Sequence, residues 1–136
     1  VVWERRRKLK PEYAGLPGPA IRDLRLAGTD VTQEVRVPRV AYLGDSAPEG
    51  LDACPAMFEA EVLITELTFV APSHRKERIH KFGHMHLDDL LERRSQLKNE
   101  LVIATHFSTR YHVRQIQSIV QRAIPDMLEG RLHLWI

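Results

Sequence analysis

The sequence has one cysteine and no long apolar run, and these two features exclude several classes of protein. Cys54 has no partner for an internal disulfide, so a secreted disulfide-built fold is excluded and a reducing cytoplasm is the expected location. No stretch approaches the roughly 18 apolar residues that a membrane span needs. The opening Val1-Val2-Trp3, followed by charged residues, is not the pattern of a secretory leader. We therefore expect no membrane segment.

An excess of charge of one sign is also lacking. The 20 Lys and Arg nearly balance the 18 Asp and Glu, which excludes a strongly basic, histone-like protein. Hydrophobic residues make up 43% of the chain and charged residues 28%, so a packed core is expected and wholesale disorder is not. The length of 136 residues fits one small domain. Because the chain lacks an initiator Met, we expect it to be a piece of a longer protein.

The one concentrated run of charge lies near the start. Residues 5–10 hold five positive side chains, Arg5, Arg6, Arg7, Lys8 and Lys10. Such a run is either a phosphate-facing patch or, as is common for charge runs, a solvated face. Prolines and glycines then mark a loop, and a short helix is expected from Pro19 until Gly28 ends it.

Short apolar runs predict a buried sheet. Residues 40–43, 62–64 and 101–104 are apolar and stop at turn or polar residues, which is typical of strands in a parallel or mixed sheet. Leucines at near-helical spacing predict a helix over 87–97, and a cleaner stripe predicts one over 113–124, closed by a proline. Gly130 leads into a last apolar segment. This alternation predicts an α/β fold.

Polar side chains follow the predicted strands, where α/β proteins place their ligand sites. Asp45 follows Gly44 after one strand, and His106 follows another. Asp45 either bridges two divalent metals or makes a local turn bond to backbone amides. His106 is either a metal ligand or a ring that satisfies a backbone carbonyl. Two ligands on one sheet edge favour metal, although catalytic zinc usually takes three protein ligands.

Two further histidines stand close together before a predicted helix. His84 and His86 form either a chelating pair, a helix N-terminus with one histidine at its dipole, or a surface turn. Glu66, at the end of the strand over 62–64, is a candidate partner for His84, because a carboxylate can orient an imidazole and support its positive form.

Four segments that carry these residues resemble one known family. They are Tyr42-Leu43-Gly44-Asp45-Ser46, Thr65-Glu66-Leu67-Thr68-Phe69, Gly83-His84-Met85-His86-Leu87 and Thr105-His106-Phe107-Ser108-Thr109-Arg110-Tyr111. In this order they resemble ribonuclease Z, the tRNA 3′-processing endonucleases of the metallo-β-lactamase superfamily, and most closely its short forms. The segment from Lys8 to Leu16 is also similar, so the resemblance covers nearly the whole chain.

The resemblance implies an αββα sandwich with two zinc ions at one edge and a role for each matching residue. Asp45 is implied as the bridging metal ligand and His106 as a terminal one. His84 is implied as the general acid and Glu66 as its partner, while Ser108 and Arg110 are implied near the scissile phosphate. Two positions depart from the family: Thr65 stands where a histidine is frequent, and His86 is an extra histidine that leaves the identity of the acid open.

The family's His-x-His-x-Asp-His motif, a further ligand histidine and the protruding tRNA-binding arm belong to the region before this one. Residues 1–136 are therefore expected to be a single C-terminal portion of a metallo-β-lactamase-like domain, inactive without its own N-terminal half. The complete enzyme is expected to be a cytoplasmic homodimer that cleaves precursor tRNA. The alternatives are another hydrolase of this fold, acting on an unknown ester or phosphodiester, and an inactive half-domain that binds RNA or a partner chain.

Overall fold

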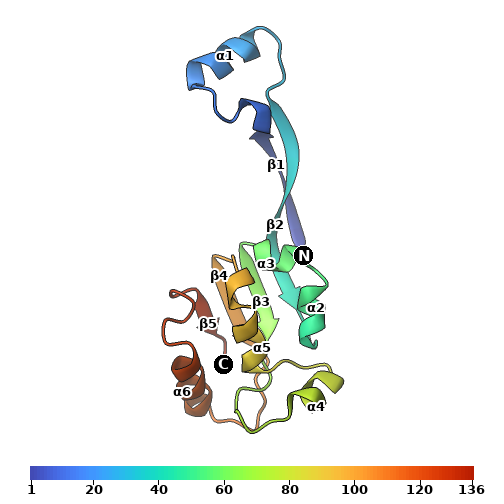
Figure 1. The fold of residues 1–136 in the computed structure, drawn as a ribbon, viewed down its shortest axis with the longest axis vertical. Coiled ribbons are helices and arrows are strands. Elements are labelled where there is room, and N and C mark those ends of the chain that lie inside the picture. Colours follow the sequence, from blue (N-terminus) through green and yellow to red (C-terminus); the bar gives the residue numbers. More distant parts are fainter. The chain divides into compact units, whose positions relative to one another are not determined.

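The computed structural model describes residues 1–136, which divide into two compact units. The larger comprises Val1–Val2 and Pro38–Ile136, and the smaller comprises Trp3–Val37. No helix has the length and apolar character needed to cross a membrane. The elements of Figure 1 are, in order, β1 (Val2–Leu9), η1 (Pro11–Tyr13), α1 (Gly18–Leu26), β2 (Thr32–Leu43), α2 (Pro48–Asp52), α3 (Ala56–Glu59), β3 (Val62–Glu66), α4 (Lys76–Lys81), α5 (Leu87–Glu92), η2 (Arg94–Gln96), β4 (Leu101–Thr105), α6 (Val113–Ala123) and β5 (Leu132–Leu134).

A parallel sheet organises the larger unit. Strands β2, β3, β4 and β5 lie side by side in sequence order, and each neighbouring pair is parallel. The helices occupy the crossovers between these strands, as parallel pairing requires. The predicted α/β class is therefore confirmed.

The two faces of this sheet differ in burial. Residues of one face join a single apolar core with side chains from α2, α3, α5 and α6. The sheet residues of that core are Ala41, Leu43, Leu63, Val102, Ala104 and Leu132. Because side chains alternate along a strand, this pattern places the helices over one face of the sheet.

The opposite face is apolar but much less covered. Tyr42, which pairs in register with Ile64 and through it with Ile103, is 65% exposed, and both isoleucines are only half-buried. Trp135, directly after β5, is 68% exposed. A sheet with one packed face and one open apolar face is half of a layered architecture.

The smaller unit contains the basic run, which lies on strand β1. The three arginines of β1 are exposed, and each has an acidic neighbour within the same unit. The ion pairs are Arg5–Glu34 (3.8 Å), Arg6–Glu4 (3.0 Å) and Arg7–Asp30 (3.3 Å). Exposed pairs of this kind contribute little to stability, and they fit both interpretations of the charge run.

Element boundaries differ from the sequence-based expectation at two places. Strand β2 begins at Thr32 and runs through Pro38 to Leu43, although the expected strand covers only residues 40–43. The Pro38 carbonyl accepts a hydrogen bond from the Glu61 N–H at 3.3 Å, so the proline still takes part in main-chain bonding through its carbonyl. The helix expected over 87–97 ends at Glu92, where Arg93 leaves helical geometry and the short helix η2 follows. The helix expected over 113–124 is confirmed as α6.

Candidate functional site

Parallel register brings the carboxyl ends of three strands together. Leu43 pairs with Thr65, and Thr65 pairs with Ala104, so β2, β3 and β4 end at the same level. The residues that follow therefore share one edge of the sheet. In this way a local pattern in the sequence becomes a cluster in space.

Glu66 is the centre of this cluster. Its side chain is only 1% exposed, and four donors surround its carboxylate. They are the main-chain N–H of Ser46 (3.1 Å), the main-chain N–H of Thr68 (2.9 Å), the Thr68 hydroxyl (2.5 Å) and Nδ1 of His84 (3.1 Å). A buried carboxylate is stable only with such partners, and here they fix its position.

Thr68 connects this carboxylate to both histidines of the edge. Its hydroxyl donates to Glu66 and lies 3.2 Å from Nδ1 of His84 and 3.1 Å from Nδ1 of His106. Since the single hydroxyl proton goes to the carboxylate, the hydroxyl oxygen accepts from Nδ1–H of His106. In the sequence, Thr68 stands out only as a member of the segment Thr65–Phe69 that resembles the family, and no role was predicted for it. The available signal was its position, two residues after a buried strand-end glutamate.

His106 presents its other nitrogen to Asp45. The His106 backbone has a φ of 59°, in the left-handed region, which turns the residue out of the line of β4. With Nδ1 protonated, Nε2 carries a lone pair, and it lies 3.4 Å from Oδ1 of Asp45. In this tautomer the ring nitrogen and the facing carboxylate oxygen are both acceptors, which is an arrangement that a cation satisfies.

The third member of this group is His84. One ligand atom each from Asp45, His84 and His106 lies within 4.8 Å of the others, and the two rings stack at 5.7 Å between centroids. One carboxylate oxygen and two imidazole nitrogens form a donor set that zinc accepts, with Nδ1 of each ring held by a second residue. These residues fit part of a metal centre. His84 suits two tasks here, proton transfer and metal binding.

His86 faces away from this edge. Its ring is 2% exposed, Nδ1 accepts from the Asp88 N–H at 3.0 Å, and Nε2 lies 2.7 Å from the carbonyl oxygen of Ala71. The Asp89 carboxylate accepts from the His86 N–H at 2.8 Å, which completes a capping box at the start of α5. Of the three interpretations of the histidine pair, the structure shows the helix N-terminus, with His86 as the capping residue.

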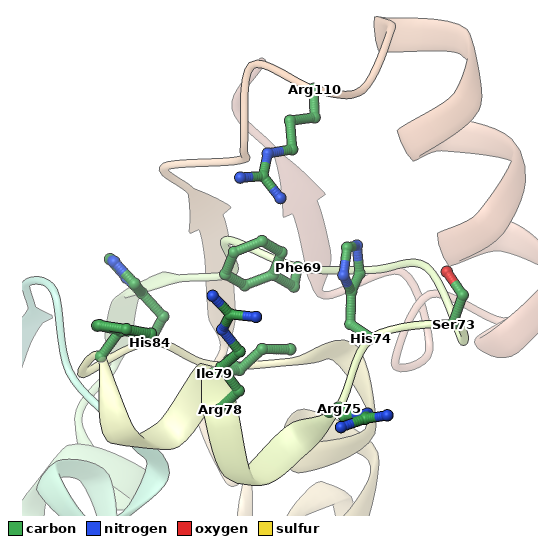
Figure 2. Close-up of a pocket in the computed structure, with 9 residues that line it drawn as sticks. Phe69, Ser73, His74, Arg75, Arg78, Ile79, His84 and Arg110 are labelled. Atoms are coloured by element: carbon green, nitrogen blue, oxygen red, sulfur yellow. The ribbon is translucent and has the colours of Figure 1, made fainter.

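The loop after β4 carries the two residues expected near the phosphate. The Ser108 N–H donates to the Thr68 carbonyl at 2.9 Å, which ties this loop to the loop after β3. Arg110 is exposed and lines a pocket together with His84, and its guanidinium group points toward Phe69 (Figure 2). The structure thus brings Asp45, Glu66, His84 and His106 into one cluster, with Ser108 and Arg110 on the adjacent loop.

No family model matches the chain, but named relatives match nearly all of it. It is 34% identical to tRNase Z TRZ1 of Arabidopsis thaliana over 97% of its own length and 48% of the relative's. It is 34% identical to the chloroplastic tRNase Z TRZ2 of the same plant, over 88% of the chain and 34% of that protein. Ribonuclease Z of Pyrobaculum islandicum is 31% identical over 92% of the chain and 46% of its own length.

The chain therefore spans about half the length, or less, of the relatives that it matches. The sequence resemblance is confirmed by these identities, and the fold and the cluster of strand-end residues agree with it. Over nearly its whole length, this chain belongs to the ribonuclease Z family.

Proposed function

We propose that residues 1–136 are the C-terminal half of a zinc-dependent endoribonuclease that cleaves the 3′ end of precursor tRNA. One observation carries the proposal: Asp45, His84 and His106 converge within 4.8 Å at the sheet edge, around an orienting carboxylate. The names of the relatives, tRNase Z and ribonuclease Z, supply the substrate class. The single free cysteine, Cys54, supports a reducing compartment, the cytoplasm.

Asp45 and His106 would hold the metal in this proposal. Their acceptor atoms lie 3.4 Å apart, and the His106 ring is fixed through Thr68. In the complete enzyme two zinc ions are expected, with Asp45 as the shared ligand. When bound, zinc polarises a phosphate and lowers the pKa of a water molecule.

His84 is proposed as the general acid. Nδ1–H donates a hydrogen bond to the Glu66 carboxylate at 3.1 Å, which leaves Nε2 directed away from that carboxylate. A proton on Nε2 would pass to the 3′ oxygen as the phosphorus–oxygen bond breaks. Glu66, which is buried and held by hydrogen bonds from Ser46 and Thr68, orients the ring. Ser108 and Arg110, on the adjacent loop, would contact the scissile phosphate.

The open sheet face is the proposed contact with an N-terminal half. Tyr42, Ile64 and Ile103 form an apolar surface across three strands, and a second sheet packed on it would complete an αββα sandwich. With His84 assigned to proton transfer, the chain supplies only Asp45 and His106 as metal ligands at the edge, whereas a two-zinc site needs more. The missing ligands would come from that second half. The complete enzyme is proposed to be a homodimer.

The test is a reconstitution. Residues 1–136 are combined, in trans or by fusion, with the portion of Arabidopsis tRNase Z TRZ1 that the chain does not match, and a precursor tRNA with a 3′ trailer is added. We expect cleavage after the tRNA and zinc in the purified complex. Asp45→Ala should remove both, because it deletes the shared ligand.

Glu49→Ala is the matched control, since Glu49 is an exposed carboxylate in the first turn of α2, just after the cluster's loop. It should leave zinc content and cleavage unchanged. A zinc-loaded complex that leaves precursor tRNA intact but hydrolyses a small phosphodiester or an ester would indicate the other hydrolase class. Unchanged zinc and turnover in Asp45→Ala would contradict the ligand assignment.

A further inference from the structure

A pocket of about 800 Å³ opens beside His84, on the side formed by α4 and the loops after β3 and β4. Figure 2 shows Phe69 in the middle, with Arg78 reaching toward it from α4 and Arg110 from the loop after β4. His74 lies next to Phe69, at 5.0 Å between ring centroids. His84 belongs both to this lining and to the metal-binding cluster.

The arginines of this pocket have no acidic partner in the chain. Many other arginines are ion-paired, for example Arg93 with Asp52 at 2.5 Å. Arg75, Arg78 and Arg110 form no ion pair with any carboxylate in residues 1–136, although all three line the same cavity. Guanidinium groups bind phosphate by paired hydrogen bonds, so this pocket is suited to a phosphate-bearing ligand.

The remaining wall is aromatic and uncharged. Phe69 contacts His74, whose ring also meets Tyr111 edge-on at 6.0 Å. Burial lowers the pKa of His74, and the charges of His86 and Arg110 lower it further, which favours the neutral form of the ring. Phe82, over which the Arg78 guanidinium lies at 6.0 Å, adds a second ring. Nucleic-acid bases stack on such rings without sequence preference.

We propose that this pocket binds the nucleotide that carries the leaving 3′ oxygen, the last nucleotide of the tRNA product. The inference rests on the proposed function, in which His84 gives its proton to that oxygen. The sugar then lies against His84, and the rest of the same nucleotide extends into the cavity that His84 lines. Its base stacks on the wall of Phe69 and His74. Arg78 holds its 5′-phosphate, and Arg110 lies opposite, near the scissile phosphate.

Adenosine 5′-monophosphate is a probe of this nucleotide, because it has a 5′-phosphate and a free 3′ hydroxyl. We would titrate it into the 136-residue chain carrying Ile103→Lys, a change on the open sheet face chosen to prevent self-association, in a chelator-containing buffer and follow the chain by NMR. We expect saturable shifts at Phe69 and His74, and weaker binding of adenosine and of inorganic phosphate. Arg78→Ala should raise the dissociation constant of the nucleotide about tenfold, through loss of one charge-assisted contact. Arg114→Ala, an exposed arginine of α6 outside the pocket, should bind as the unmodified chain does.

Shifts confined to other surfaces, equal losses in Arg78→Ala and Arg114→Ala, or phosphate binding as tight as that of the nucleotide would each overturn the inference. The result is independent of cleavage, since no metal or tRNA is present. Nucleotide binding in a chain whose reconstituted complex fails to cleave tRNA would overturn the proposed function alone. Cleavage without nucleotide binding would overturn the pocket alone.

Discussion

Replacing Thr68 by valine removes one hydroxyl and keeps the shape of the side chain, so it isolates the contribution of that group. The hydroxyl donates to the buried Glu66 at 2.5 Å and lies 3.2 and 3.1 Å from Nδ1 of His84 and His106. Hydrogen bonds to charged groups contribute about 1.5–3 kcal/mol each, and a buried carboxylate that loses a donor pays a desolvation penalty. We expect Thr68→Val to lower the free energy of unfolding by about 2–3 kcal/mol.

The measurement is urea denaturation of the 136-residue chain, with Thr65→Val as the matched control. Thr65 is also buried, but its hydroxyl donates to an uncharged main-chain oxygen, that of Glu66, at 3.2 Å. Thr65→Val should therefore lower the free energy of unfolding by about 0.5–1.5 kcal/mol, the range of neutral hydrogen bonds. Thr68→Ser should restore most of the stability. A loss in Thr68→Val no larger than that in Thr65→Val would refute the idea that this hydroxyl organises the edge.

Three further predictions follow from contacts described above. Asp52 makes a two-point contact with Arg93, and this contact holds the pKa of Asp52 below its usual range. The pair therefore stabilises the fold above about pH 4, and its contribution disappears as the pH falls through the lowered pKa of Asp52. Because Asp52 is partly exposed, Asp52→Asn should cost about 0.5–1 kcal/mol at pH 7, and the unfolding curves of both proteins should converge once the pH lies below the lowered pKa of Asp52. In the reconstituted enzyme, His84→Ala should lower turnover by about 10²–10⁴-fold with zinc retained, while loss of zinc would identify His84 as a ligand. The isolated chain should self-associate through its open face. Ile103→Lys should lower the molar mass of the particle measured by sedimentation. A monodisperse, fully active monomer with two tightly bound zinc ions would contradict the need for a second half.

The strand-end residues can be predicted from the sequence, because the residues that follow neighbouring parallel strands lie at the same edge of the sheet. Each apolar run ends at a defined residue, and a shared register then aligns Asp45, Glu66 and His106 at one edge. Nothing beyond the pattern of apolar runs was needed to place these side chains near each other.

The roles of Thr68, His84 and His86 depended on information that is not local. His86 becomes a cap only because α5 begins at Leu87, and a start two residues earlier would make His84 the capping residue instead. Thr68 is informative only once two loops from different strands have closed around it. Likewise, no single residue marks the boundary between the two compact units, because strand β2 continues through Pro38.

The bonds around Glu66 have a consequence for the dynamics of the chain. Two amides that lie outside every helix and strand, those of Ser46 and Thr68, donate to a carboxylate that water does not reach. Loop amides ordinarily exchange their hydrogens with solvent quickly, because local opening costs little. Here, opening either loop would strip a buried carboxylate of a donor, so these two amides should exchange on the slow timescale of the strands. The sheet edge that carries Asp45, His84 and His106 would then be among the most rigid parts of the larger unit.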